Sequence, residues 1–134
     1  MSGYSGTPLL QKLGIKAGMK LMVLNPPPGY DRTLGPLPDG VKRAAALQRP
    51  LDFVHCFVTS RATLEARFAR LAAALAPAGM LWISWPKKAA KVETDLTEDL
   101  VRAIALAGGL VDVKVCAVDE AWSGLKLVRR LRDR

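Results

Sequence analysis

The chain has 134 residues, of which 50% are apolar and 24% are charged, and its formal net charge is +8. This balance excludes an intrinsically disordered chain, and no apolar run is long enough to cross a membrane, so we expect one domain over residues 1–134 and no membrane partner. The first twenty residues lack the apolar core and cleavage site of a secretory signal. Two cysteines inside apolar runs are typical of reduced thiols, which predicts a cytoplasmic location.

The first fifty residues predict short elements around a turn-rich segment. Pro8, three leucines and then Gly14 predict a short helix, and residues 20–25 predict a strand. Residues 26–38 are rich in proline and glycine, which predicts a loop where a crossover helix would be usual. Residues 41–47 contain three alanines that favour a helix, but their length also suits a strand, and we favour a short strand.

Beyond residue 50 the apolar pattern alternates between strands and helices. Residues 51–58 form a near-continuous apolar run, which is typical of a central strand covered on both faces. Ser60 is the expected N-cap of an amphipathic helix over residues 61–75. A Pro-Ala-Gly sequence at residues 77–79 should end that helix, and residues 80–85 predict a second strand, parallel to the first.

The C-terminal part predicts a helix followed by a hairpin. Asp95, with Glu98 three positions later, is the expected start of a helix that ends at Gly108. Residues 110–118 and 124–131 then predict two antiparallel strands. The whole order predicts an α/β fold with a mostly parallel sheet and an antiparallel C-terminal strand.

This order of elements is similar to the C-terminal half of the class I methyltransferase fold, a Rossmann-like three-layer sandwich. Residues 75–84 (LAPAGMLWIS) resemble the passage that leads into the fifth strand of that fold, and residues 13–24 (LGIKAGMKLMVL) resemble the lead-in to its first strand. The resemblance implies a truncated class I methyltransferase fold.

A second resemblance covers nearly the full length. The segments YSGTPL, FVTSR, WPKK, TDLTE, VCAVDE and WSGLK resemble an uncharacterised bacterial family of small proteins; they stand at residues 4–9, 57–61, 85–88, 94–98, 115–120 and 122–126. This resemblance implies kinship and supplies no activity.

The loop after the first predicted strand departs from the methyltransferase pattern. In that family it is rich in glycine, so that backbone amides can reach S-adenosylmethionine, whereas residues 25–30 here read NPPPGY. Three prolines remove three amide donors, and Asn25 replaces the acidic residue usual at the strand end. An Asn-Pro-Pro-aromatic motif of amino-group methyltransferases is interrupted by Pro28 and Gly29. We therefore predict no cofactor and do not expect standard methyltransferase activity.

Open parallel sheets bind ligands beyond the carboxyl ends of their strands. That rule predicts a pocket lined by side chains from several loops: Asn25, Tyr30, Thr59, Ser60, Ser84, Trp85 and Trp122. Three lysines in the loop after the second long strand, with a nearby arginine and threonine, predict a site for an anion such as phosphate or carboxylate: Arg61, Lys87, Lys88, Lys91 and Thr94. The alternatives are a solvated loop whose lysines bind nothing specific, and a Trp122 that only packs on a neighbouring strand.

The remaining chemistry-bearing residues favour structural roles. His55, between Phe53 and Phe57 in the predicted central strand, favours a buried, hydrogen-bonded histidine over a general base. One histidine and two distant cysteines predict no metal site. Trp82 and Trp85 are three positions apart in one strand, so they should point to opposite faces.

Three functions are compatible with these patterns. We favour a degenerate methyltransferase-like module with a binding or regulatory role. The alternatives are an enzyme that acts on a small anionic metabolite through the loop from Trp85 to Thr94, and a nucleic-acid-binding protein that uses the arginines of residues 129–134. A sheet edge near residues 20–47 would be covered by the proline-rich segment or by a second copy, which leaves a monomer or a homodimer.

Overall fold

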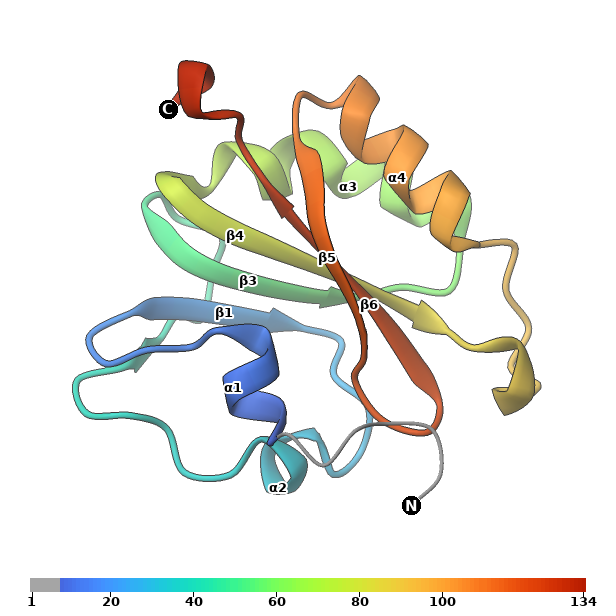
Figure 1. Ribbon diagram of the computed structural model, residues 1–134, viewed down its shortest axis with the longest axis horizontal. Coiled ribbons are helices and arrows are strands. Elements are labelled where there is room, and N and C mark those ends of the chain that lie inside the picture. The colour runs from blue at the N-terminus through green and yellow to red at the C-terminus, as the bar shows by residue number, and fades with distance from the viewer. Residues whose placement is uncertain (1–7) are drawn as a thin grey trace.

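A computed structural model describes residues 8–134 as a six-stranded sheet with helices on both faces (Figure 1). In chain order the elements are α1 (Leu9–Leu13), β1 (Lys20–Leu24), α2 (Tyr30–Leu34), β2 (Lys42–Arg43), β3 (Leu51–Phe57), α3 (Arg61–Ala73), β4 (Leu75–Pro86), α4 (Glu98–Ala107), β5 (Val111–Ala117) and β6 (Trp122–Val128), with short 3-10 turns at Lys88–Ala90 and Leu131–Asp133. None of the described helices is long and apolar enough to cross a membrane.

The strand order is β2-β1-β3-β4-β6-β5. The first four strands are parallel, and β6 runs antiparallel to both of its neighbours, β4 and β5. The predicted α/β class, with a mostly parallel sheet and an antiparallel C-terminal strand, is confirmed. As expected from its apolar run, β3 lies inside the sheet and is buried along nearly all of its length.

Each face of the sheet has its own apolar core. On one face, α3 and α4 pack against Val54, Ile83 and Trp85, and on the other, α1 and α2 pack against Phe53 and Trp82. The two tryptophans therefore point to opposite faces, as their spacing predicts. The Ser60 hydroxyl accepts the amide proton of Thr63, which confirms Ser60 as the cap of α3.

The turn between α3 and β4 differs from the sequence prediction. The helix ends at Ala73, and β4 begins at Leu75, so Pro77 and Gly79 lie inside the strand. The register explains this difference, because Leu51 pairs with Leu75 while Phe53 pairs with Met80, and the residues between form a bulge. A Cβ atom at Gly79 would lie 2.6 Å from the Leu51 carbonyl oxygen, so glycine permits this close approach.

Two further corrections concern residues 26–47. The segment predicted as a loop contains α2. Gly29, which directly precedes this helix, has the left-handed backbone conformation. The predicted strand over residues 41–47 is reduced to Lys42–Arg43, which pairs with β1 and forms one outer edge of the sheet. Tertiary pairing limits this strand to two residues, and such a short strand offers little edge for another chain to pair with.

Candidate functional site

Three hollows lie where strands β1, β3 and β4 end. The first, of about 410 Å³, separates the end of β4 from the start of α4. The second, of about 470 Å³, lies between the β3–α3 turn and residues 93–95. The third, of about 280 Å³, lies at the ends of β1 and β3 beside Trp122.

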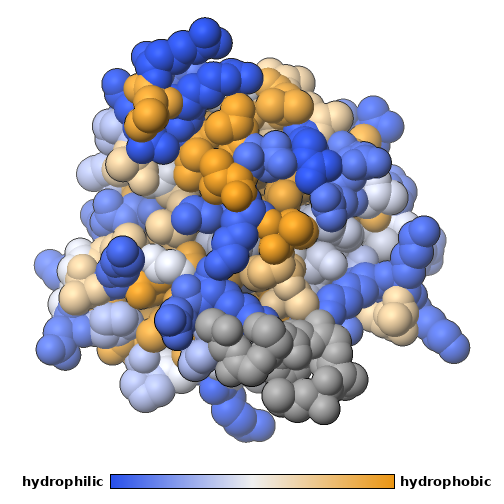
Figure 2. All heavy atoms as spheres, in the orientation of Figure 1, coloured by the Kyte–Doolittle hydropathy of each residue, from blue (hydrophilic) through white to orange (hydrophobic). Residues whose placement is uncertain are grey.

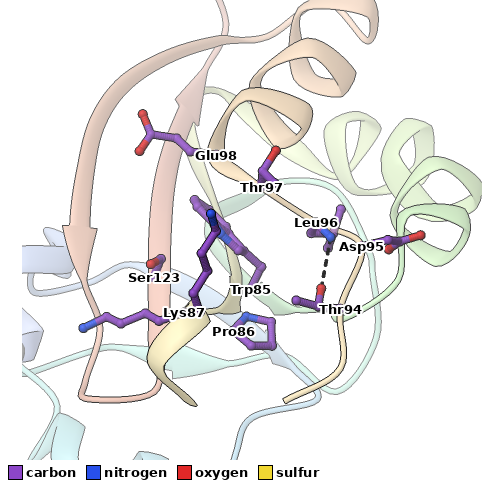
Figure 3. A pocket seen from close by; sticks show the side chains of 10 residues that line it. Trp85, Pro86, Lys87, Thr94, Asp95, Leu96, Thr97, Glu98 and Ser123 are labelled. Atoms are coloured by element: carbon purple, nitrogen blue, oxygen red, sulfur yellow. Dashed lines mark hydrogen bonds between the residues drawn. The ribbon is translucent and has the colours of Figure 1, made fainter. Parts of the chain in front are cut away.

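The first hollow is lined by both basic and acidic side chains (Figure 3). Its lining comes from the end of β4, from the segment that precedes α4 and from β6, as follows: Trp85, Pro86, Lys87, Lys88, Thr94, Asp95, Leu96, Thr97, Glu98 and Ser123. In Figure 3 Asp95 and Lys87 lie on opposite sides of Trp85 and Pro86.

Arg102 holds the acidic side chains at the start of α4. Its guanidinium lies 2.6 Å from the Glu98 carboxylate and 3.0 Å from that of Asp99, and it also donates to Asp112 at 2.8 Å. The hydrogen bond from Arg102 lowers the pKa of Asp112. The single positive charge of Arg102, one turn from Glu98 on the same helix, is thus shared among three carboxylates.

The Asp95 carboxylate serves a different helix from the one predicted. Its Oδ1 accepts the amide proton of Arg61 at 2.7 Å, so it caps the start of α3. The start of α4 is capped by Thr97, whose hydroxyl accepts the amide proton of Leu100 at 3.2 Å. The sequence places Asp95 two residues before the true cap, and the contact with α3 is long-range, which local spacing could not reveal.

Thr94 fastens the same segment to the turn between β3 and α3. Its hydroxyl donates to the Thr59 carbonyl at 2.6 Å and accepts the amide proton of Leu96 at 3.1 Å. A hydroxyl has one proton to donate, and this proton is already engaged. In this arrangement Thr94 shapes the hollow and does not offer a donor to an anion.

The structure brings together some of the predicted site residues and separates others. Trp85, Lys87, Lys88 and Thr94 line the first hollow; Thr59, Ser60 and Thr94 line the second; Asn25, Thr59 and Trp122 line the third. Arg61 and Lys91 line none of them. The Arg61 side chain instead lies 3.4 Å from Glu65 on the surface of α3, and Lys91 is exposed.

Tyr30 and Ser84, also predicted to line the pocket, are buried in the core. The Tyr30 hydroxyl lies 2.9 Å from Nδ1 of His55, and the Ser84 hydroxyl lies 2.7 Å from Nε2 of the same ring. Burial lowers the pKa of His55 to about 3 and raises the pKa of Tyr30. His55 is thus the buried, hydrogen-bonded histidine that its strand position predicts.

Sequence reasoning missed several residues that line the hollows. Ser123 reaches the first hollow because it pairs with Trp85 across β4 and β6, a register that no local pattern specifies. Thr63 reaches the third hollow from the first turn of α3, where its sequence indicates only a helix position. Thr97 could have been found as an alternative helix cap, since threonine before two acidic residues is a usual start of a helix.

The loop after β1 does not fit S-adenosylmethionine in the mode that the fold implies. Residues 26–28 are prolines without amide protons, and the amide of Tyr30, which follows Gly29, donates to the Pro27 carbonyl at 3.1 Å. At the end of β2, where the fold usually carries an acidic residue for a ribose hydroxyl, stands Arg43, paired with Asp31 at 2.8 Å. These positions therefore lack three amide donors and an acidic side chain at the end of β2.

Comparisons with solved structures identify the architecture. A TehB-like S-adenosylmethionine-dependent methyltransferase from Corynebacterium glutamicum matches with a TM-score of 0.58 and 11% identity over 90% of this chain and 85% of that protein. An S-adenosylmethionine-dependent methyltransferase from Aquifex aeolicus matches with a TM-score of 0.55 and 16% identity over 92% of this chain and 89% of that protein. A possible exported protein from Bordetella parapertussis matches with a TM-score of 0.62 and 12% identity over 90% of this chain and 65% of that protein.

At this level of identity the likeness shows the fold, which is Rossmann-like and methyltransferase-like. No protein-family model matches the chain, and no curated protein matches its sequence. Kinship with the small bacterial family therefore stays a prediction, and residues 4–7 of its first segment lie outside the described residues.

Proposed function

We propose that this chain is a methyltransferase-fold binding module that does not transfer a methyl group from S-adenosylmethionine held in the standard mode. The observation that supports this proposal is the segment after β1. Its prolines offer no amide protons, and its Tyr30 side chain is directed into the core toward His55 instead of toward a ligand. The segment serves as a structural connection in this chain.

The ligand that best suits the carboxyl edge is a small anion in the first hollow. Lys87 and Lys88 contribute two ammonium groups to its lining. The two acidic side chains of the lining have partners within the protein, Glu98 in Arg102 and Asp95 in the Arg61 amide. Both carboxylates keep their negative charge, so the attraction for an anion comes from the ammonium groups of Lys87 and Lys88.

Binding is favoured over catalysis by the same contacts. General acid–base chemistry needs a titratable group that is held near the reacting atoms with a pKa suited to proton transfer. The one histidine of the chain is sealed in the core, and the carboxylates that line the first hollow already accept hydrogen bonds within the protein. An enzyme acting on a small anionic metabolite is thus the weaker alternative.

Isothermal titration with inorganic pyrophosphate tests the anion site. The double substitution Lys87→Ala and Lys88→Ala should abolish binding and leave the free energy of unfolding nearly unchanged, because surface substitutions cost within about 0.5 kcal/mol. Arg130→Ala with Arg132→Ala removes two positive charges elsewhere and should retain binding. Equal weakening by both pairs would mean diffuse attraction by the net charge and no site in the hollow.

A further inference from the structure

The β5–β6 hairpin concentrates lysines on the face that α1 shares. Lys114 and Lys126 are direct cross-strand partners. Lys126 is also the partner of Trp82 in β4, whose indole donates to the Leu13 carbonyl at the end of α1, so these side chains share the α1 face. The charge of Lys16, in the loop after α1, acts on Lys126 as well. We call Lys16, Lys114 and Lys126 the lysine stripe.

A bulge in β5 keeps acidic groups away from this stripe. Residues two apart in a regular strand share a face, so Asp112 would normally lie beside Lys114. The register shifts between these two residues, which leaves Val113 as the extra residue and turns Asp112 to the opposite face. There its carboxylate lies 2.8 Å from Arg102 of α4.

No carboxylate of residues 8–134 lies within ion-pair distance of the lysine stripe. In every ion pair among these residues the cation is an arginine: Arg43, Arg61, Arg102 or Arg132. The Lys114 ammonium instead donates to the Lys12 carbonyl at 3.2 Å, near the C-terminal end of α1. That contact leaves the positive charge of Lys114 in place, next to Lys126.

Like charges directly opposite each other on neighbouring strands destabilise a sheet. Burial, together with the charges of Lys114 and Lys16, lowers the pKa of Lys126, which is the effect expected of mutual repulsion. Lys16 and Lys114 are exposed and Lys126 is half-buried, so a ligand can reach them. Figure 2 shows strongly hydrophilic side chains between α1 and the hairpin, where this stripe lies.

We propose that the lysine stripe binds the phosphate backbone of a nucleic acid without sequence preference. Neighbouring strands lie about 5 Å apart, so Lys114 and Lys126 leave the sheet side by side and, with Lys16, place several positive charges on one surface, which suits an extended polyanion. Lysine offers compact charge without the fork of arginine that selects one carboxylate or phosphate geometry. This surface is separate from the hollow at the carboxyl edge, so neither proposal depends on the other.

Fluorescence anisotropy with a short, labelled single-stranded DNA of mixed sequence tests this inference. The change Lys114→Gln with Lys126→Gln should weaken binding at low salt by at least about tenfold and reduce the slope of log affinity against log salt by about 1.4, since each phosphate contact with a single strand contributes about 0.7. Arg130→Gln with Arg132→Gln is the charge-matched control and should change affinity by less than about threefold. Circular dichroism of each variant checks that it is folded.

Three results would overturn the inference. Equal weakening by both double variants would assign the attraction to the net charge of +8. Absence of binding by the unchanged protein at low salt would remove the site. Competition by polyglutamate as strong as by DNA of equal charge would indicate an acidic protein surface as the partner.

Stability gives a second, independent measurement. Lys126→Glu replaces repulsion of Lys114 by attraction, so it should raise the Tm at low salt by roughly 1–3 °C while it abolishes DNA binding. If Lys126 served only stability, Lys126→Glu would lower the Tm and leave DNA binding unchanged. That result would contradict the proposal.

Discussion

The hydroxyl of Tyr30 lies 2.9 Å from Nδ1 of His55, which ties the segment after β1 to the centre of the sheet. The Tyr30 ring also meets Phe57 edge to face, with ring centroids 5.3 Å apart. On the other side of the imidazole, Nε2 lies 2.7 Å from the Ser84 hydroxyl in β4. One buried histidine thus connects β3 with β4 and with α2, the first helix after the proline loop.

Tyr30→Phe should destabilise the protein. The substitution keeps the ring but leaves Nδ1 of His55 without a partner in the core, which costs about 1–3 kcal/mol in the free energy of unfolding. Urea denaturation monitored by tryptophan fluorescence measures the change. Asp31→Asn is the control. Asp31 is the exposed residue that follows Tyr30, and its substitution should change the free energy of unfolding by less than about 0.5 kcal/mol.

Stability should fall as the pH is lowered below about 6.5. In the unfolded chain His55 takes up a proton near pH 6.5, whereas burial lowers the pKa of His55 in the folded protein to about 3. Acid therefore favours the unfolded state. The free energy of unfolding should change with pH by up to about 1.4 kcal/mol per pH unit between those two values, and this dependence should vanish above pH 7.

Denaturant unfolding at a series of pH values from 7 to 5 measures this slope, since aspartates and glutamates titrate mostly below that range. In His55→Gln the slope between pH 6.5 and 5 should disappear, even if the variant is less stable throughout. A slope that persists in this variant would assign the proton uptake to other groups.

Asp95→Ala should cost about 1 kcal/mol of stability, because the Arg61 amide at the start of α3 loses its acceptor. Asp95→Asn keeps an amide oxygen that can accept the same proton and should recover most of the loss. Glu93→Ala, two residues away and exposed, should have little effect. Thermal melts of the three variants measure the differences, and equal losses for Glu93→Ala and Asp95→Ala would refute the cap.

Much of the fold could be predicted because its strands and long helices carry strong local patterns. The apolar run of β3 and the leucine spacing of α3 are set by burial on the sheet, and Ser60 precedes α3 as a cap should. The errors occur where tertiary contacts override local preference. Pro77 and Gly79 look like a turn, yet the bulge opposite Leu51 accommodates them inside β4.

The candidate site was less predictable for the same reason. Strand polarity places Thr59, Trp85 and Lys87 at one edge, which the order of elements implies. Whether a side chain near that edge turns inward depends on long-range partners, and both Tyr30 and Ser84 turn to His55. Thr94 was expected at the anion site, but its hydroxyl proton is donated to the Thr59 carbonyl in the turn after β3.

Titration of the protein with S-adenosylmethionine tests the central claim most directly. Because Pro26, Pro27 and Pro28 have no amide protons and Arg43 stands where a carboxylate is needed, we predict no saturable heat at millimolar cofactor. Replacing the three prolines by glycines should not restore tight binding, since the carboxylate is still absent. A Kd in the micromolar range for the unchanged protein would contradict the account.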